Sequence, residues 1–285
     1  MRKAASTKFG ISFLHSLDAK SDCRMPFIDT HSHIYGEEFA ADLDAVVQRA
    51  KNAGAEKLFL PNENAGTLDA VLDVCDKYPG FCFPMIGLHP EEIKENYSGV
   101  LDNMERRLQV PNPFIAVGEV GIDYHFQSEN KAEQICAFRR QTEWAGKYSL
   151  PLMIHSRDSI DDLLAVLEDC GGKELTGVFH CFSGTEEEAR RFLSYPGFVL
   201  GIGGIVTFKR STLAEVLKNS VPVDRIVLET DCPYMAPVPM RGKRNESAFV
   251  PYIAAKIAET YGLTTEEVYE ITCKTAKKIF PKAWQ

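Results

Sequence analysis

The sequence predicts an α/β fold, a (β/α)8 TIM barrel that forms a single domain. From Met25 onward, short apolar runs alternate with longer segments whose apolar residues recur at helical spacing. The apolar runs are nearly continuous, which is typical of strands buried on both faces of a parallel sheet. Eight such strand–helix units in about 260 residues fit a closed barrel. The alternative, an open doubly wound sheet, would normally have a glycine-rich turn after its first strand, where this chain has HSHIYGEE.

Each expected strand is an apolar run, and each expected helix is the periodic segment after it. The strands are expected within FIDTHSHI (27–34), EKLFLP (56–61), FCFPMIGLHP (81–90), PFIAVGEVGID (113–123), LPLMIHSRD (150–158), TGVFHCFSG (176–184), GFVLGIGGI (197–205) and DRIVLETDCP (224–233). The helices are expected at 44–53, 65–78, 100–108, 131–147, 160–167, 186–193 and 213–219, with two closing helices at 248–260 and 265–279.

Composition and charge limit the functional classes. With 45% apolar and 25% charged residues, the chain has an ordinary globular composition, and no apolar run is long enough to span a membrane. The eight cysteines are scattered and form no CxxC pair, so we expect free thiols in a reducing, cytoplasmic environment. The net charge of −8 disfavours broad nucleic-acid binding unless several carboxylates hold divalent cations.

Residues 1–24 differ from the remainder of the chain. They are basic and rich in Ser and Ala at the start, and Lys8 interrupts their apolar segment, which disfavours a secretory signal. We expect a disordered leader outside the fold: a weak transit-peptide resemblance, an alternative start, or a leader added for expression. The barrel is expected to occupy residues 25–285, with the natural beginning at Met25.

Polar residues of metal-binding type end several of the predicted strands. These residues are His31, His33, Glu119, His155, His180 and Asp231. Each has a simpler structural interpretation, such as a hydrogen-bonded core histidine, a helix cap, a turn residue or a buried ion-pair partner. Active sites of barrels lie at the C-terminal ends of the strands, however, so all six would meet at one rim. That convergence favours a metal site.

The ligand types predict a centre with two divalent ions, Mg, Mn or Zn. Imidazole and carboxylate together bind Zn and Mn well and Mg less readily. One ion is expected to take His31, His33, Glu119 and Asp231, and the other Glu119, His155 and His180, with Glu119 as the bridge. Asp29 and Glu229 share strand parity with two of the ligands, so we expect them to orient imidazole N–H groups, the alternative being a buried pair with a lysine.

The order of the motifs resembles one known family. DTHSHI, GLHPE, GEVGIDY, PLMIHSRD, HCFSG, GGIVTFK, LETDCPY and PVPMRGKRNES occur as in the TatD family of metal-dependent deoxyribonucleases, from Phe27 to Phe280. The resemblance implies a barrel of the metallo-dependent hydrolase superfamily with 3′–5′ exonuclease activity on DNA, and it places the metal ligands on the same six residues. Met240 and Ser247 depart from the family pattern in the basic loop, which affects the expected substrate preference.

The resulting functional hypothesis is hydrolysis of phosphodiester bonds by a metal-activated water. Asp231 is expected to act as ligand and general base, with Glu119 as the other catalytic residue. The expected substrate is DNA, with RNA as the alternative, at single-stranded ends. No membrane partner is expected, and the sequence is consistent with a monomer. The expected phosphate contacts are His89, Arg157, Lys209, Arg241 and Arg244. Tyr124 and Tyr234 are candidates for stacking on a base.

Three alternatives remain open from the sequence. A metal-dependent hydrolase of a lactone or cyclic amide would use the same barrel, but often carries a modified lysine where this chain has Glu119. An enzyme that hydrolyses the ester of aminoacyl-tRNA would equally need the basic residues that are expected to contact phosphate. A non-enzymatic metal-binding protein would have no need of open coordination positions.

Overall fold

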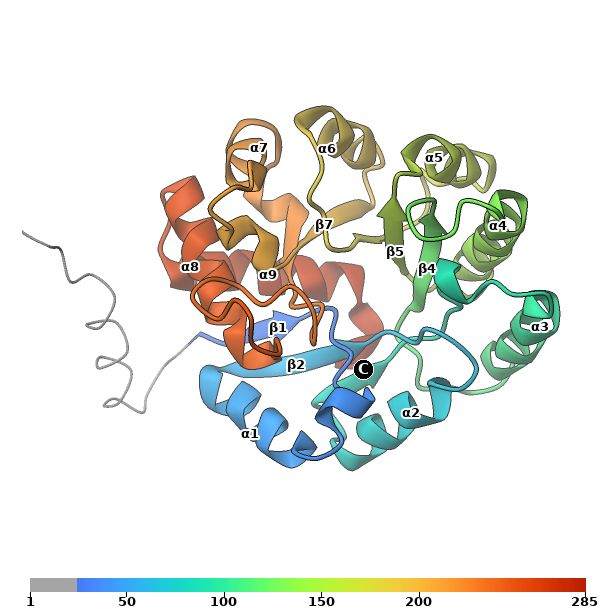
Figure 1. Cartoon of the computed structure of the whole chain (residues 1–285), viewed down its shortest axis with the longest axis horizontal. Coiled ribbons are helices and arrows are strands. Elements are labelled where there is room, and N and C mark those ends of the chain that lie inside the picture. The colour runs from blue at the N-terminus through green and yellow to red at the C-terminus, as the bar shows by residue number, and fades with distance from the viewer. Residues whose placement is uncertain (1–24) are drawn as a thin grey trace, which may run out of the picture.

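A computed structural model describes residues 25–285 and contains, within them, eight β-strands and nine α-helices (Figure 1). The predicted leader, residues 1–24, lies outside the described residues. The strands are β1 (Phe27–Asp29), β2 (Ala55–Leu60), β3 (Cys82–Pro84), β4 (Val117–Asp123), β5 (Leu152–Arg157), β6 (Gly177–Phe179), β7 (Phe198–Ile202) and β8 (Ile226–Leu228). The helices are α1 (Leu43–Ala53), α2 (Leu68–Lys77), α3 (Tyr97–Leu108), α4 (Lys131–Tyr148), α5 (Ile160–Asp169), α6 (Glu186–Leu193), α7 (Leu213–Ser220), α8 (Val250–Tyr261) and α9 (Thr265–Ile279).

All neighbouring strands are parallel and follow the order of the sequence. They form two ladders, β1-β2-β3 and β4-β5-β6-β7-β8. Between β3 and β4 the ladders are joined by backbone hydrogen bonds from Ile115 N to Pro84 O (2.9 Å) and from Gly118 N to Ile86 O (2.9 Å). Between β8 and β1 a bond of 3.0 Å runs from Thr30 N to Leu228 O. The predicted (β/α)8 barrel is confirmed, and α1 to α8 surround it (Figure 1).

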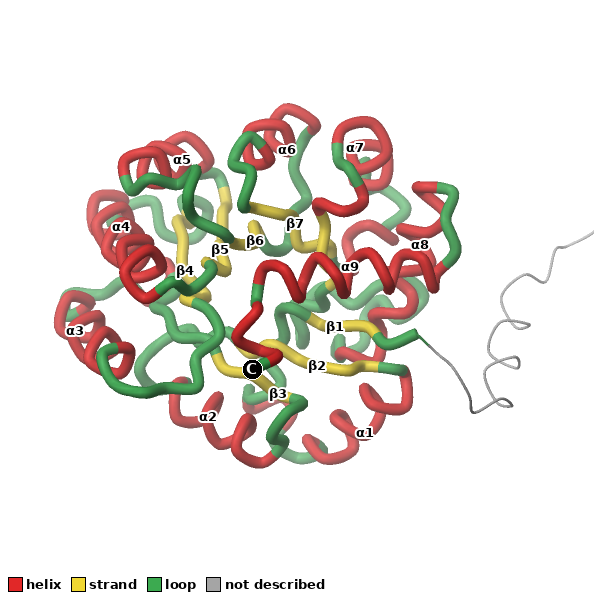
Figure 2. The backbone as a smooth tube through the Cα atoms, turned by 180° about the vertical axis from the view of Figure 1, so that it is seen from behind, coloured by secondary structure: helices red, strands yellow, loops and turns green. Residues whose placement is uncertain are grey.

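The interior of the barrel near the N-terminal end of the strands is filled by apolar side chains from the strands and the segments next to them. This layer comprises Ile28, Phe59, Met85, Ile115, Met153, Val178, Val199 and Val227. Helix α9 closes the N-terminal end of the barrel and adds Ala276 and Ile279 to the same cluster (Figure 2). Because this end is plugged, only the C-terminal end of the strands is open to a substrate.

The helices lie close to their predicted ranges, and local sequence explains where two of them begin. Thr185 before α6 and Thr264 before α9 each form a capping box with the glutamate three residues later. The strands are shorter than the apolar runs predict. In particular, β1 ends at Asp29, so the expectation that His31 and His33 lie on a regular strand is wrong. The chain beyond Asp29 stays extended between its neighbours through bonds from Ser32 N to Phe59 O (3.1 Å) and from His33 N to Cys232 O (2.9 Å).

The cysteines agree with the expectation of free thiols. In the part of the chain that the structure describes, seven cysteines are present and all are unpaired with one another. None of the helices within residues 25–285 combines the length and the apolar character that crossing a bilayer requires.

Candidate metal centre

Glu119 of β4 lies among histidines from several strands. Its Oε2 atom is 3.1 Å from Nε2 of His31 and 3.6 Å from Nε2 of His33. Asp231, in the loop after β8, belongs to the same group, because its Oδ1 is 3.5 Å from Nε2 of His33 and 3.7 Å from Nε2 of His31. The structure thus brings together the four residues that the sequence assigns to one ion.

The other oxygen of Glu119 faces a second group of histidines. Oε1 is 2.7 Å from Nε2 of His180, 3.1 Å from Nδ1 of His155 and 3.2 Å from Nε2 of His89. Two of these, His155 and His180, are the residues that the sequence assigns to the second ion. The two oxygens of one buried carboxylate therefore point to separate sets of nitrogen atoms, as expected of a carboxylate that bridges two cations.

Hydrogen bonds behind two of the rings determine which ring nitrogen carries the hydrogen. Tyr35 donates its hydroxyl hydrogen to Oε2 of Glu63 (2.9 Å), so its oxygen accepts from Nδ1 of His33, 2.7 Å away. Oδ2 of Asp123 lies 2.8 Å from Nε2 of His155 and accepts its hydrogen. Nε2 of His33 and Nδ1 of His155, the atoms that face the centre, are then left with the lone pairs that a metal ligand needs.

His89 has the opposite arrangement. Its Nδ1 accepts the backbone N–H of Glu91 at 3.2 Å, at the start of a short 3-10 helix. The ring hydrogen is therefore on Nε2, the atom that lies 3.2 Å from Oε1 of Glu119. In this arrangement Nε2 of His89 donates to Glu119, and the role of His89 as a phosphate contact stays a prediction.

Carboxylates around the centre favour positive charge at its histidines. Burial alone would lower the pKa of His33, but its hydrogen bond to Asp231 and the charges of Glu63 and Glu119 raise that pKa to about 9. The completely buried His31 behaves differently, because burial lowers its pKa to about 4. Since the same carboxylates would stabilise a metal cation, the field of the centre suits a positively charged ion.

Some nitrogen and oxygen atoms at and around the centre lack hydrogen-bond partners. Nε2 of His31 and Nε2 of His33 are only 3.0 Å apart, so a proton or a cation must lie between them. Among residues 25–285, Nδ1 of His31, Nδ1 of His180 and Oε2 of Glu229 are buried side-chain atoms without a hydrogen-bond partner. Three groups of ligand atoms are close enough to hold an ion: His31–His33–Glu119, His89–Glu119–His155 and His31–His180–Glu229.

Asp29 supports the backbone of the centre. Its carboxylate accepts hydrogen bonds from N (2.9 Å) and Oγ1 (2.6 Å) of Thr230 and from the backbone N of His31 (3.4 Å). Asp29 was expected to orient an imidazole N–H group, but it contacts backbone and hydroxyl groups instead. Asp29 thus fixes the segments after β1 and β8 that carry the ligands, with a pKa raised by burial to about 6.

Glu229 is closer to the expected position. Its Oε1 accepts the backbone N–H of Cys181 and lies 3.9 Å from Nδ1 of His180, beyond hydrogen-bond distance. Burial raises the pKa of Glu229 well above its usual range. No lysine pairs with Asp29 or Glu229 among the described residues, which removes the alternative of a buried lysine pair.

Three residues at the centre, Asp123, Tyr35 and Glu63, were not predicted from the sequence. Asp123 stands in GEVGIDY, on the same strand as Glu119 and four residues beyond it, so strand parity would have signalled it. Tyr35 lies two residues after His33, and this spacing is a weak signal because the chain has already left β1. No local pattern marks Glu63, which belongs to the loop after β2.

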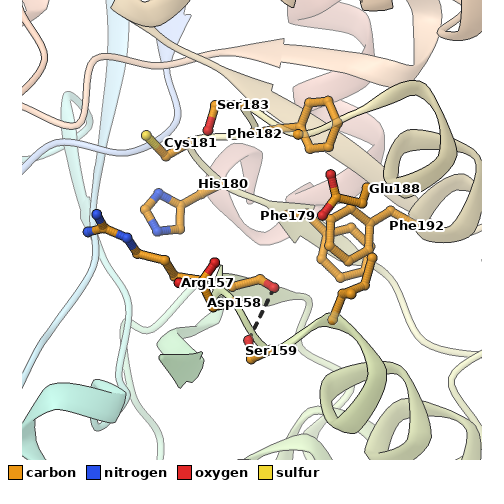
Figure 3. A pocket seen from close by; sticks show the side chains of 13 residues that line it. Arg157, Asp158, Ser159, Phe179, His180, Cys181, Phe182, Ser183, Glu188 and Phe192 are labelled. Carbon is orange, nitrogen blue, oxygen red and sulfur yellow. Dashed lines mark hydrogen bonds between the residues drawn. The ribbon is translucent and has the colours of Figure 1, made fainter. Parts of the chain in front are cut away.

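A cavity of about 560 Å³ opens onto the centre at the C-terminal end of the barrel. His33, Glu119, His155, His180 and Asp231 line it, whereas His31 is fully buried and does not. A smaller cavity of about 300 Å³ adjoins it between the loops after β5 and β6 (Figure 3). Arg157 and His180 belong to the lining of both cavities.

The predicted basic residues divide into two groups. Arg157 lines the main cavity, so it is placed to meet a substrate. Lys209, Arg241 and Arg244 are absent from that lining. Arg244 makes two hydrogen bonds of 2.8 Å to the carboxylate of Asp42, which agrees with a structural role for this arginine.

The aromatic residues differ from the expectation in one position. Tyr234 lines the cavity as expected. Tyr124 instead donates a hydrogen bond of 2.6 Å to Oδ2 of Asp162, and its ring is covered by Lys131 at 4.2 Å. Phe126, two residues further along the same loop, lines the cavity in its place.

A barrel with buried imidazole and carboxylate groups at its open end defines a class, the metal-dependent hydrolases of (β/α)8 fold. Comparison with known proteins agrees. The model of the family described as TatD related DNase matches residues 28–281. The chain therefore belongs to the TatD-related DNase family, and it is a hydrolase.

Individual relatives cover nearly the whole described chain. An uncharacterized metal-dependent hydrolase, YabD of Bacillus subtilis, is 35% identical over 252 residues, 88% of this chain and 98% of that protein. The 3′-5′ ssDNA/RNA exonuclease TatD of Erwinia billingiae is 33% identical over 257 residues, with the same coverage of 88% and 98%. Among solved structures, the TatD homologue YJJV of Escherichia coli K12 is 29% identical with a TM-score of 0.82, covering 90% of this chain and 98% of that one.

Proposed function

We propose that this protein hydrolyses phosphodiester bonds of DNA, with RNA as the alternative substrate, from single-stranded 3′ ends with the help of two divalent ions, Mg, Mn or Zn. The observation that carries the proposal is the position of Glu119, whose two oxygens face two different sets of nitrogen atoms. His31, His33 and Asp231 would share one ion with Glu119, and His155 and His180 the other. The exonuclease named among the relatives supports this substrate.

The side chains at the cavity suit this reaction. Bound divalent ions would supply activation of a water molecule and neutralisation of phosphoryl charge. Asp231 would accept the proton of the attacking water, because its carboxylate lines the cavity beside the ligands. The guanidinium of Arg157 would donate hydrogen bonds to phosphate oxygens, and His89, which also lines the cavity, would be a second phosphate contact.

The direct test is single-turnover cleavage of an end-labelled single-stranded oligonucleotide. Metal-stripped protein should be inactive, and protein loaded with Mg²⁺, Mn²⁺ or Zn²⁺ should give a ladder that shortens from the 3′ end. A variant with both His155→Ala and His180→Ala should lose the ladder, because it lacks the nitrogen ligands of one ion. Absence of cleavage with every metal, while the ions remain bound, would refute the nuclease and turn the search to lactones, cyclic amides and aminoacyl-tRNA esters.

Arg157 and Arg244 should differ in their effect on substrate binding. Arg157→Ala is expected to raise KM for the oligonucleotide by about tenfold, because it removes a charge-assisted contact to phosphate. It should also reduce the slope of log kcat/KM against log salt by about 0.7, the value for one phosphate contact on a single strand.

Arg244→Ala is the matched control, because the guanidinium of Arg244 is bound to Asp42 outside the cavity. Its KM and salt slope should equal those of the wild type. Equal effects of the two substitutions would contradict the assignment of Arg157 as the phosphate contact.

We also infer a cytoplasmic setting. The described cysteines are free thiols, and three of them, Cys75, Cys82 and Cys232, are buried. Such thiols persist in a reducing compartment.

A further inference from the structure

Exposed apolar side chains gather at the rim of the metal centre. Phe126 is 59% exposed, Tyr234 56% and Met235 44%, and all three line the main cavity. They account for half of the large hydrophobic side chains that are exposed within residues 25–285; the others are Met25, Val110 and Val238. Exposed apolar surface that concentrates around a polar reaction site indicates contact with a ligand.

The two aromatic rings come from opposite sides of the barrel. Phe126 belongs to the loop between β4 and α4, and Tyr234 to the loop between β8 and α8. In a ring of eight strands that follow the order of the sequence, β4 and β8 are half a circumference apart (Figure 1). The cavity that both rings line therefore lies between them, and Glu119 also lines it.

Asp123 connects the loop that carries Phe126 to the metal centre through hydrogen bonds. Oδ1 of Asp123 accepts the backbone N–H groups of His125 (2.8 Å) and Phe126 (2.9 Å), while Oδ2 is bonded to His155. The guanidinium of Arg157 lies 4.5 Å from the centroid of the Phe126 ring. The carboxylate of Asp123 thus positions both His155, a candidate metal ligand, and the exposed ring of Phe126. The guanidinium of Arg157, the expected phosphate contact, lies against the same ring.

The loop that carries Tyr234 is also held by hydrogen bonds. Its backbone N donates to the carbonyl oxygen of Asp231 at 2.9 Å, and its own carbonyl oxygen accepts from Nδ2 of the buried Asn245 at 2.6 Å. The backbone of each ring is therefore held by a residue next to the candidate ligands. These hydrogen bonds connect the loop that carries each ring to residues of the metal centre or to its neighbouring segments.

We propose that Phe126 and Tyr234 form an aromatic clamp that holds two unpaired bases, one on each side of the phosphate that is cut. The inference rests on the proposed nuclease function and names the residues that select the form of the substrate. A base in a duplex is already stacked and paired, so only a single strand or a frayed end can offer its faces to both rings. Stacking depends little on which base is present, so the clamp selects single strands without reading sequence.

The test combines protein variants with substrates that lack bases. Phe126→Leu and Tyr234→Leu remove the rings but keep apolar side chains, and Phe126→Tyr and Tyr234→Phe keep the rings. Val110→Ala, at another exposed apolar position, is the control. Each protein is loaded with the most active metal and given an end-labelled oligodeoxyadenylate, and the same strand with abasic sites on both sides of the 3′-terminal phosphodiester. Metal content and thermal unfolding are measured for every variant.

The clamp predicts a specific pattern. Each leucine variant should lower kcat/KM on the normal strand by about 5- to 150-fold, the range expected for one base–aromatic stack, while cleaving the abasic strand at the wild-type rate. The ring-preserving variants and Val110→Ala should match the wild type on both substrates. The wild type itself should prefer the normal strand by at least the factor lost in either leucine variant.

Three results would each overturn part of the inference. If the leucine variants cleave the normal strand within about twofold of the wild type, the clamp is wrong while the nuclease function stands. If the metal-loaded wild type cleaves neither the normal nor the abasic strand, the proposed function itself fails and the clamp fails with it. Equal losses on normal and abasic strands would mean that the rings act by holding the protein in shape, and would also refute the clamp.

Discussion

Glu119→Gln is expected to lower the single-turnover rate of phosphodiester cleavage by at least about 10⁴-fold, the scale seen when one member of a catalytic unit is removed. Glutamine has nearly the shape of glutamate, but it lacks the charge and offers one oxygen in place of two. Neighbouring histidines, His180 first among them, hold the pKa of Glu119 well below its usual range in spite of burial, so the wild-type side chain is a carboxylate at neutral pH. The variant should also retain less metal after dialysis, measured by elemental analysis.

Glu92→Gln provides a control with the same chemical change in the same cavity. Glu92 lines the cavity, but its carboxylate is paired with Lys94 at 2.7 Å. Loss of this partly exposed, already paired charge should change the rate by about threefold or less. A Glu119→Gln protein that kept its metals and its rate would contradict the bridging role of Glu119.

The sequence was sufficient for the barrel because its main signal is local. Each buried parallel strand must be apolar on both faces, and each covering helix must be apolar on one, so the alternation of the two patterns predicts the topology. Strand lengths were less predictable. The run FIDTHSHI reads as one strand, yet β1 ends at Asp29, because the pairing that defines a strand depends on where the neighbouring chain is.

The candidate ligands were predictable for a related reason. A residue that ends a strand of a closed barrel must lie at the open rim, whatever the distance in sequence between the strands. Contacts between loops do not follow from this rule. The contact of Tyr35 with Glu63 joins residues in different loops, and no composition pattern indicates it.

The same limit explains the basic loop. PVPMRGKRNES reads as a set of phosphate contacts because it is basic and follows β8. In the folded chain, Arg244 is paired with Asp42, a residue that is 202 positions away in sequence. Charge near a site thus predicts a candidate, and only the fold determines whether another side chain has already neutralised it.

Gly121→Ala should lower the free energy of unfolding by roughly 2–5 kcal/mol and displace a candidate ligand. Gly121 of β4 is paired with His155 of β5 and has φ of +152°, a backbone conformation that alanine rarely adopts. A Cβ atom at this position would overlap the carbonyl oxygen of His155. The two strands would have to separate, which would move His155 away from Glu119. Urea unfolding gives the stability, and metal content gives the effect on the centre.

Gly99→Ala shows what the same substitution does where the fold does not require glycine. Gly99 lies in α3, and a Cβ atom there would meet no atom within 4 Å. Alanine is a better helix former than glycine by about 1 kcal/mol, so this variant should unfold at a higher urea concentration than the wild type and keep its metal. The opposite signs separate the general effect of replacing glycine from the requirement at Gly121. If both variants unfolded at the wild-type midpoint, close packing of β4 against β5 would not be what positions His155.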